Sequence, residues 1–378
     1  MARFVKRGNV WQYEISYKDT DGKYKKLRKS GFSKKSEAIA AAGEIESDLF
    51  KGYNATSKDI LLSDYFEKWI NTYKKDKVSD KTFNIYLYSL KIINEYLEGA
   101  TVKTLTRSVY QEKLNAYSSK HSTSSTRKIN IHIHAALSNL LDEGVIKMDF
   151  TKGAVTIGKV KPKDEEDKYL NFEEFSRLIQ FVREKINPLY ATPFMVYIAS
   201  LTGMRYSELV GLTWDNVSFD NNYINVKRTW DFKNNSFAPT KNKESIRRIY
   251  LDDNTLYEIK KYKLSQEKLF KKYKVNPPHN FVFYNVRDGL VSNSAVNKQI
   301  RKLCKVLEIN EKLTCHGLRH SHASMLIFEG INILYISKRL GHKSYNVTMS
   351  TYAHAIKELQ EQENINMKKV LEKLSRSK

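Results

Sequence analysis

Cysteine and long apolar segments are scarce in this sequence of 378 residues. Only Cys304 and Cys315 are present, and no CxxC pair occurs, which argues against a disulfide framework and a cysteine-based zinc site. No apolar run approaches the roughly 18 residues of a membrane helix, and the start MARFVKRGNVWQYEI lacks the apolar segment of a secretory signal. We therefore expect a cytoplasmic protein with reduced thiols and no membrane partner.

Acidic residues are also the minority among the charged residues. Lys and Arg number 65 against 42 Asp and Glu, which gives a formal net charge of +23. Such an excess attracts polyanions, because basic side chains release the counterions that surround nucleic acid. The charge therefore favours nucleic acid as the partner, although a solvated basic surface or attachment to anionic lipid would have the same composition.

The length and the balance of residue types predict several folded domains. Hydrophobic residues make up 41% and charged residues 28% of the chain, as in globular proteins. A chain of this length exceeds the usual size of a single domain. No internal repeat and no low-complexity segment is present.

The first 50 residues predict a small antiparallel sheet followed by a helix. Apolar and polar residues alternate in VWQYEISY and KYKKLR, with turn-forming residues between them. Ser33, followed by Ser36 and Glu37, predicts the start of the helix. Basic and aromatic residues share this module, so we expect one sheet face to lie in a DNA groove. The expected DNA contacts are Arg3, Lys6, Arg7, Tyr13, Tyr17, Lys25 and Arg28.

Residues 61–151 have the periodicity of helices, as in YFEKWINTY, TFNIYLYSLKIINEYL and RKINIHIHAALSNLLDEGVI. The polar stretch at residues 118–128 predicts a loop that leads into a helix, with Arg127 and Lys128 placed for phosphate contacts. His132 and His134 are two residues apart and would face different sides of a helix, which argues against a metal pair.

A charged stretch that contains Pro162 interrupts this periodicity at residues 158–170 and predicts an exposed linker. Beyond it, we expect a long apolar helix at residues 192–201, strands in NYINV, SIRRIYL and NFVFYN, and helices to the end. The predicted fold class is multidomain α+β: a three-stranded sheet with a helix, an all-helical domain, and a mostly helical domain with a small antiparallel sheet.

The most informative pattern is the spacing of His, Arg and Tyr near the C-terminus. His316 and Arg319 are three residues apart and would share one face of a helix. Leu-Gly-His follows after about twenty residues and ends at His342, and Tyr352 lies ten residues later. An HxxR pair alone is common by chance, whereas the joint spacing is far more specific.

Four segments resemble the motifs of the tyrosine recombinases: TGMRYSELVGLTW, HGLRH, LGHKS and TYAH. The resemblance covers residues 168–356 and implies an active site of Arg205, Lys241, His316, Arg319, His342 and the nucleophile Tyr352. It also implies an arm-type DNA-binding domain at 1–57, a core-binding domain at 58–158, a linker at 159–167 and a catalytic domain at 168–378. In this family the core-binding and catalytic domains clamp opposite sides of the duplex.

The chemistry of phosphodiester cleavage explains such a set of residues. Negative charge builds on the non-bridging oxygens in the transition state, and the guanidiniums of Arg205 and Arg319 suit that charge. Because a tyrosine has a pKa near 10, its hydroxyl needs a base as it attacks. His316 is the expected proton acceptor, and His342 the expected donor to a phosphate oxygen.

The leaving 5′ oxygen needs a proton, which a lysine ammonium on a hairpin between strands can supply. The family's lysine falls on Lys241 in PTKNKESIRRIYL. Lys243 is the competitor, because residues two apart on a strand share a face. Glu208 matches an acidic family position and would orient the first arginine.

The resemblance also predicts partners. The module at residues 1–57 favours an integrase that integrates and excises a mobile element, a phage or a conjugative transposon, at double-stranded DNA attachment sites. The expected partners are further copies in a tetramer on DNA, an excisionase and DNA-bending proteins. No cofactor is implied, because a phosphotyrosine link would conserve the bond energy, and no GxxxxGK[ST] loop is present.

Three alternatives stay open at this point. The HxxxHxH spacing of His316, His320 and His322 also permits a zinc reading, although the Glu of a metalloprotease helix is absent and no metal is expected. A DNA-binding regulator would need only the charge and the sheet, and a related topoisomerase would share the chemistry.

An apolar stripe of Met367, Val370, Leu371 and Leu374 predicts docking of the C-terminal helix, either on its own domain or on a neighbouring subunit.

Overall fold

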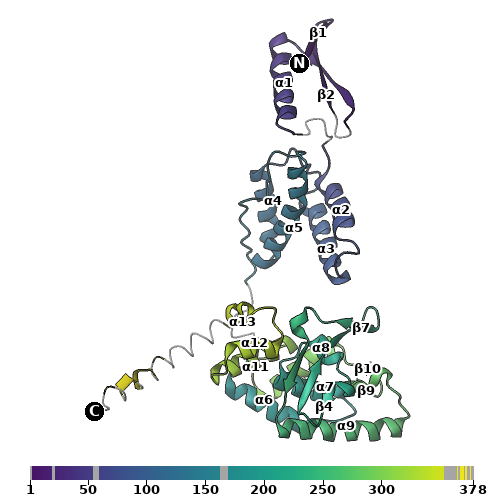
Figure 1. Ribbon diagram of the computed structural model, residues 1–378, viewed down its shortest axis with the longest axis vertical. Coiled ribbons are helices and arrows are strands. Elements are labelled where there is room, and N and C mark those ends of the chain that lie inside the picture. Colours follow the sequence, from purple (N-terminus) through teal and green to yellow (C-terminus); the bar gives the residue numbers. More distant parts are fainter. Residues whose placement is uncertain are drawn as a thin grey trace. The chain divides into compact units, whose positions relative to one another are not determined.

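The computed structural model describes residues 2–18, 22–53, 59–161 and 169–352, and the C-terminal residues 364, 367–369, 371–372 and 375. The chain divides into two compact units, Met1–Pro162 and Lys163–Lys378 (Figure 1). The predicted boundary at 57/58 lies within the stretch 54–58, and most of the predicted linker 159–167 lies within the stretch 162–168. Both stretches are outside the described residues. Those boundaries stay predictions. Among the described residues, no helix is long and apolar enough to cross a membrane.

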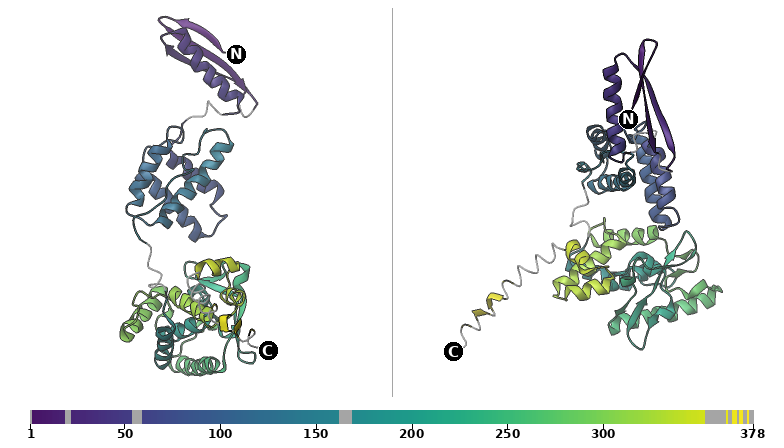
Figure 2. Two further views of the ribbon diagram at one scale, coloured as in Figure 1. Left: turned by 90° about the vertical axis from the view of Figure 1, so that its left-hand side faces the viewer. Right: turned by 45° about the horizontal axis from the view of Figure 1, so that its top comes forward.

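The N-terminal strands form the predicted antiparallel sheet. β1 (Arg3–Arg7), β2 (Val10–Lys18) and β3 (Tyr24–Phe32) pair in the order β1-β2-β3. α1 (Lys35–Phe50) lies along one face of this sheet, as both views of Figure 2 show. Strand alternation turns Tyr13 and Ile15 toward the helix, where both are buried with Ala42. The Ser33 hydroxyl donates to the Glu37 carboxylate at 2.9 Å, which confirms the predicted helix start.

Helices fill the rest of the first unit. They are α2 (Leu62–Tyr73), α3 (Asp80–Tyr96), α4 (Arg107–Ser118) and α5 (Thr123–Asp142). Their apolar faces meet in one core, which includes Phe66, Trp69, Ile93 and Leu137. The Ser122 hydroxyl accepts from the Ser125 N–H and caps α5, so Arg127 and Lys128 lie near the start of a helix and are exposed, as predicted.

In the second unit, α7 (Ala191–Thr202) is the buried centre. Helices that precede it and helices that follow it in the sequence pack against it (Figure 1). Its apolar residues face neighbours on nearly every side, as expected for a helix that is hydrophobic all round. The other helices described in this unit are α6 (Phe172–Glu184), α8 (Tyr206–Val210), α9 (Asp253–Tyr273), α10 (Asn293–Leu307), α11 (Cys315–Phe328), α12 (Ile333–Leu340) and α13 (Tyr345–Thr351).

Small antiparallel sheets flank these helices and confirm the predicted fold class. β4 (Val217–Ser218), β5 (Tyr223–Val226) and β8 (Arg247–Tyr250) form one sheet in the order β4-β5-β8. β6 (Arg228–Asp231) pairs with β7 (Ser236–Pro239), and β9 (Tyr284–Asn285) pairs with β10 (Gly289–Leu290). Short 3-10 helices occur at Trp214–Asn216 (η2), Lys243–Ser245 (η3) and Pro278–Asn280 (η4).

Two local predictions were wrong. NFVFYN is not one strand: only Tyr284–Asn285 pairs in a sheet, and Phe281 makes a single bridge to Thr213. PTKNKESIRRIYL is not a hairpin either, because β7 pairs with β6 whereas β8 pairs with β5. The Asn242 side chain accepts from the Ser245 N–H at 2.9 Å and turns the chain into η3. Lys241 therefore lies in a connection between two sheets.

Candidate active site

The six predicted catalytic residues come from five places in the second unit. Arg205 precedes α8, Lys241 lies in the connection between β7 and β8, and His316 and Arg319 lie in the first turns of α11. His342 follows the glycine that ends α12, and Tyr352 follows α13. The packing of α11 on α7, of α12 on α11, and of α12 on β8 brings these places together.

The two arginines are held by the turn at the end of α12. Arg319 is 2% exposed, and it donates to the carbonyls of Gly203 and Leu340, both at 2.7 Å. Arg205 donates to the carbonyl of Gly341 at 3.0 Å. The last carbonyls of a helix have no partner within the helix and carry partial negative charge. They therefore stabilise two neighbouring guanidiniums in one place.

Glu208 lies against Arg205, as predicted from the sequence. Its carboxylate pairs with the Arg205 guanidinium at 2.8 Å and with the Arg247 guanidinium at 3.0 Å. It also accepts the backbone N–H of Arg205 at 3.0 Å. Burial alone would raise the pKa of Glu208, but the charges and hydrogen bonds of Arg247 and Arg205 outweigh it and lower that pKa. Glu208 is thus an ionised anchor for Arg205.

Gly341 allows the turn after α12 to approach η3 closely. Its φ is +67°, and an added Cβ would lie 2.9 Å from the Cα of Ser245. A side chain at this position would meet both backbone strain and a clash. Glycine is therefore required where the turn carrying His342 meets the segment that follows Lys241.

Tyr352 is buried, and its hydroxyl has no hydrogen-bond partner among the described residues. Its ring packs in a small apolar cluster with Ala323, Ile336 and Leu340. Burial raises the pKa of Tyr352 to about 12, against the opposing charges of Arg319 and Arg205. The phenol is therefore protonated at neutral pH, and an attack by its oxygen requires a proton acceptor.

His316 is exposed, and its ring lies beside His320 with ring centroids 4.6 Å apart. The His320 ring in turn contacts the Tyr352 ring, with centroids 5.5 Å apart. Desolvation by the surrounding protein, followed by the charges of Arg319, Arg205 and Lys241, lowers the pKa of His316. A neutral His316 can accept a proton. The sequence did not indicate the position of His320 between His316 and Tyr352, because that position depends on the tertiary fold.

The position of Lys241 favours it over Lys243. The Lys241 charge is among those that act on His316, whereas Lys243 begins η3. The argument that the two lysines share a strand face was wrong, because neither lies on a strand.

His342 is held by a residue that the sequence did not indicate. Its Nδ1 lies 2.7 Å from the hydroxyl of Thr348, which is fully buried. Burial, and then the charges of Arg319 and Arg205, lower the pKa of His342 to about 3. When Thr348 donates to Nδ1, the neutral ring carries its proton on Nε2 and can donate it.

The three histidines of the HxxxHxH spacing do not form a zinc site. His322 is buried, accepts from the Arg339 side chain at 3.2 Å, and packs where a Cβ on Gly203 would lie. It thereby supports the glycine whose carbonyl holds Arg319. Within the described residues, no three His, Cys, Asp or Glu side chains form a group that could hold a metal ion.

Comparison with known families finds a match for the N-terminal module and another for the second unit of the chain. Residues 168–358 match the model of the phage integrase family, and residues 3–49 match that of the arm DNA-binding domain. The chain belongs to the phage integrase family. This family member is therefore a site-specific recombinase that cleaves and rejoins DNA strands. Neither a non-catalytic regulator nor a topoisomerase is favoured.

Similar proteins match the recombinase over much of its length. The ICEBs1 integrase of Bacillus subtilis is 25% identical over 316 residues, which cover 82% of this chain and 84% of that protein. The integrase of Staphylococcus phage L54a is 30% identical over 207 residues, 52% of this chain and 58% of that one. The Tn1549 transposon integrase, solved in complex with transposon right end DNA, shares the fold with a TM-score of 0.65 at 17% identity, covering 80% of this chain and 98% of that one.

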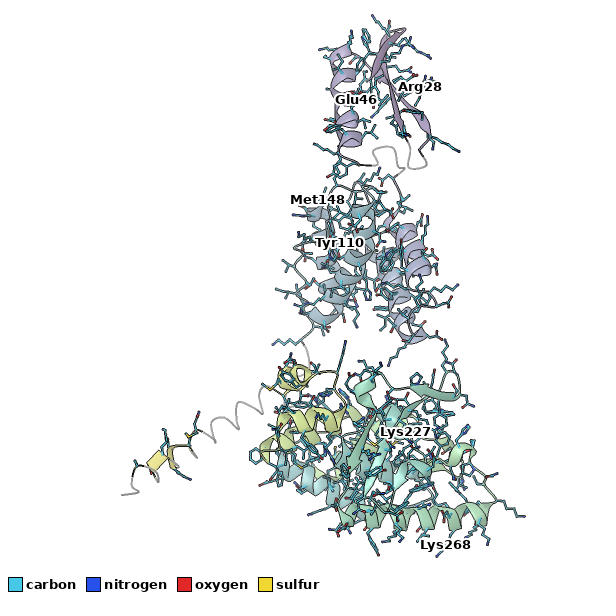
Figure 3. All side chains as sticks on the ribbon, viewed as in Figure 1. Arg28, Glu46, Tyr110, Met148, Lys227 and Lys268 are labelled. Carbon is cyan, nitrogen blue, oxygen red and sulfur yellow. The ribbon has the colours of Figure 1, made fainter. Side chains whose placement is uncertain are left out.

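Strand alternation in the arm domain of the recombinase places six of its seven predicted DNA contacts on the two faces of the sheet. Arg3 on β1 and Arg28 on β3 lie on either side of Glu14 on β2, on the sheet face away from α1. Arg7 lies on the same face, four residues after Arg3 on β1. Figure 3 labels Arg28 on this sheet. Lys6, Lys25 and the half-buried Tyr17 are on the helix side by the same alternation, and both lysines are exposed.

Tyr13 corrects the prediction for this sheet. It was expected to contact DNA, but it is 1% exposed and packs against Phe32, with ring centroids 5.7 Å apart. The alternation of Tyr13 with Ile15 could have indicated this position. Its role is in the core of the arm domain.

Proposed function

We propose that this recombinase integrates and excises a mobile element through a 3′-phosphotyrosine intermediate formed by Tyr352. The observation that carries the proposal is the meeting of Arg205, Arg319 and Tyr352 around the last turn of α12. Two fixed guanidiniums beside a buried phenol suit an in-line attack on a DNA phosphate. The names of the ICEBs1 and phage L54a integrases support a mobile element as the substrate.

The site residues have separate roles in this reaction. Tyr352 attacks the phosphorus while Arg205 and Arg319 stabilise the charge on the non-bridging oxygens. His316 accepts the phenol proton, and His342 donates to a phosphate oxygen through Nε2–H. Because Tyr352 has a raised pKa and His316 a lowered one, full proton transfer before attack is uphill. Proton transfer therefore accompanies bond formation to phosphorus.

Lys241 protonates the leaving 5′ oxygen, and Glu208 fixes Arg205. The scissile bond breaks as the bond from Tyr352 to phosphorus forms, so no bond energy is lost to water. A 5′-hydroxyl of the second DNA then attacks the phosphotyrosine and releases the tyrosine, with the proton movements reversed. The chain's own residues thus supply every proton and charge that the reaction needs.

We also propose how the rest of the chain serves this reaction. Residues 1–57 bind arm-type sites, residues 58–158 and 168–378 bind the core site, and 159–167 link them. Arg127 and Lys128 contact phosphates from the exposed start of α5. Four copies assemble on two DNA sites, with an excisionase and DNA-bending proteins that set direction. An enzyme of this kind acts on DNA in the cytoplasm.

The C-terminal stripe is proposed to dock on a neighbouring copy of the chain. Met367 and Leu371 are more than half exposed, whereas Val370 and Leu374 lie outside the described residues. Deletion of residues after 358 should therefore abolish tetramer assembly and strand exchange on DNA. Unchanged assembly and exchange would contradict docking between copies.

Recombination in a purified system tests the proposed function. The substrate is a supercoiled plasmid that carries the joined ends of the element and the target site in which it resides. We expect site-specific recombinants that still form in EDTA, and none with Tyr352→Phe. Tyr345→Phe is the matched control, because Tyr345 lies in the same short segment but is 53% exposed. Relaxation without recombinants would instead indicate a topoisomerase, and DNA binding alone a regulator.

A further inference from the structure

Arg247, on β8, lies outside the six-residue site, yet every nitrogen of its guanidinium is engaged there. Its side chain is 6% exposed. Nε donates to the carbonyl of Arg339, Nη1 to the carbonyl of Ser245 at 2.9 Å, and Nη2 to the carboxylate of Glu208 at 3.0 Å. A planar guanidinium with three acceptors from three segments fixes those segments in one geometry.

The first of these segments is the end of α12. Three consecutive backbone carbonyls at this end each accept from a different arginine side chain. The carbonyl of residue Arg339 accepts from Arg247, that of Leu340 from Arg319, and that of Gly341 from Arg205. The carbonyls of Leu340 and Gly341 therefore align the two arginines that are proposed to bind phosphate. Arg247 holds the carbonyl just before these two. A shift of this turn would move both guanidiniums and His342 together.

The second segment is the one that carries Lys241. β8 follows η3 after Ile246. The backbone of Ser245 lies so close to the turn that a Cβ on Gly341 would be 2.9 Å from the Ser245 Cα. Arg247 bonds to both sides of this contact, at Ser245 and at Arg339. Arg247 therefore fixes the segment that carries Lys241 relative to the turn that carries His342.

The third partner is Glu208, which Arg205 and Arg247 share. One carboxylate oxygen faces each guanidinium. Further charged groups near Glu208 are cationic as well: Arg319 on α11 acts on it, and Lys227 and Arg228 line the same small cavity (Figure 3 labels Lys227). Removal of Arg247 would leave a buried carboxylate with less compensation, and its affinity for a proton would rise.

We propose that Arg247 is a positioning residue for strand cleavage. It keeps Glu208 ionised against Arg205, and it clamps the turn that carries His342 to the segment that carries Lys241. The role rests on the proposed function, since it acts through residues assigned there. Arg247 touches no reacting atom, so its contribution is to geometry and charge.

The pH dependence of cleavage separates this role from simple support of the fold. In Arg247→Met, Glu208 gains a proton at a higher pH than in the parent chain and then holds Arg205 less firmly. The cleavage rate of this variant should therefore fall more steeply as pH decreases. A merely structural residue would reduce the rate by the same factor at every pH.

The test measures single-turnover formation of the covalent adduct on a nicked suicide substrate at saturating DNA, from pH 5.5 to 8.5. We expect Arg247→Met to cleave about 10- to 100-fold more slowly, because a small misplacement of catalytic groups has an effect of that size. The decrease of its rate at low pH, the acid limb of the profile, should begin at a higher pH than in the parent chain. Arg248→Met is the matched control, because Arg248 is exposed on the same strand and stacks on Tyr223. It should cleave at the parent rate.

One further variant keeps the proposal testable if Arg247→Met folds poorly, and a double variant tests the origin of the pH shift. Arg247→Lys retains the charge but not the planar fork, so its rate should be intermediate and its pH profile close to that of the parent. Adding Glu208→Gln to Arg247→Met removes the titrating carboxylate and should abolish the shift of the acid limb. DNA affinity should change by less than about twofold in each variant, because these groups face inward.

The outcomes distinguish the inference from the function on which it rests. Parent-rate cleavage by Arg247→Met, or a loss that is uniform over pH and follows a lower melting temperature, would overturn the positioning role. An acid-limb shift that persists with Glu208→Gln would also overturn it. Absence of an adduct in the parent chain would instead contradict the proposed function.

Discussion

The arginines of the arm domain and those of the catalytic unit have opposite surroundings. The Arg28 side chain is 58% exposed and pairs with Glu14 on an open sheet face. Arg319 is 2% exposed and is fixed by two backbone carbonyls. An exposed cation adds to affinity through salt-sensitive attraction and carries little orientation. A buried one is oriented before the substrate arrives. We therefore propose that the same type of side chain serves DNA binding in one region and chemistry in the other.

Burial has a consequence for the charge of Arg319. Burial, and then the neighbouring charge of Arg205, lower the pKa of Arg319 to about 9, while Glu208 opposes this effect. A pKa near 9 leaves the guanidinium charged at neutral pH. The carbonyls of α12 and the carboxylate of Glu208 therefore maintain a cationic pocket that a phosphate can complete.

Apart from loss of the nucleophile itself, Arg319→Lys should slow cleavage more than any other substitution considered below. A lysine keeps the charge but cannot reach the carbonyls of Gly203 and Leu340 and a phosphate at once. We expect the adduct to form roughly 100- to 1,000-fold more slowly, as on loss of one transition-state donor, with little change in DNA affinity. Single-turnover cleavage and a binding titration measure the two quantities. Weaker binding with an unchanged rate would contradict the assignment.

Gly341→Ala tests whether the turn after α12 must stay in place. The positive φ alone should reduce the free energy of unfolding by about 1–2 kcal/mol, and the Cβ must also displace Ser245. Gly330→Ala is the matched control, since its φ is +73° but no atom lies within 4 Å of its Cβ. Denaturant titrations should show both variants destabilised, whereas cleavage assays should show a slower rate only for Gly341→Ala. Equal cleavage rates would refute a role for the turn.

Arg28→Ala should have a smaller effect, confined to binding. We expect the salt dependence of binding to arm-site DNA to weaken by about one unit of slope, while cleavage of a saturating core site stays unchanged. Lys29→Ala, next to it on the helix side of the sheet, should change the slope less. Titrations at several salt concentrations measure both. A cleavage defect in Arg28→Ala would remove the distinction between the two regions.

The smallest effect is expected for Tyr13→Phe. Because the ring of Tyr13 lies under α1, loss of its hydroxyl should leave the affinity for arm-site DNA within about twofold, given that mutations outside the contact surface act only through stability. A tenfold loss of affinity in the same titration would show that Tyr13 contacts DNA after all.

The spacing of motifs identified six residues that the fold brings together, because such spacing reflects fixed helices and turns. Residues that act through tertiary contacts were missed. Arg247 lies between Ser245 and Ile249, both buried, and this alternation could have indicated an inward side chain. Two of its partners, however, are distant in the sequence: the carbonyl of Arg339, 92 residues away, and the carboxylate of Glu208, 39 residues away. No local pattern marks them. Thr348 beside His342 was missed for another reason, since threonine is unremarkable in a helix.

The overall α+β class and most helices followed from periodicity, whereas connections did not. Whether residues 236–250 form a hairpin depends on which strands pair, and β6 and β5 take β7 and β8 as partners instead. Strand pairing is a non-local competition that alternation alone does not decide. For the same reason, the sequence could not reveal that Ser245 meets Gly341.

Mapping the covalent adduct shows which side chain attacks the DNA phosphate. The parent chain is trapped on a suicide substrate, digested with nuclease and trypsin, and analysed by mass spectrometry. Trypsin should release residues 344–357, which contain both Tyr345 and Tyr352, so fragment ions can distinguish them. We predict a nucleotide phosphate on Tyr352 and no adduct in Tyr352→Phe. A phosphate on Tyr345 or on another residue would contradict the assignment of Tyr352 as the nucleophile.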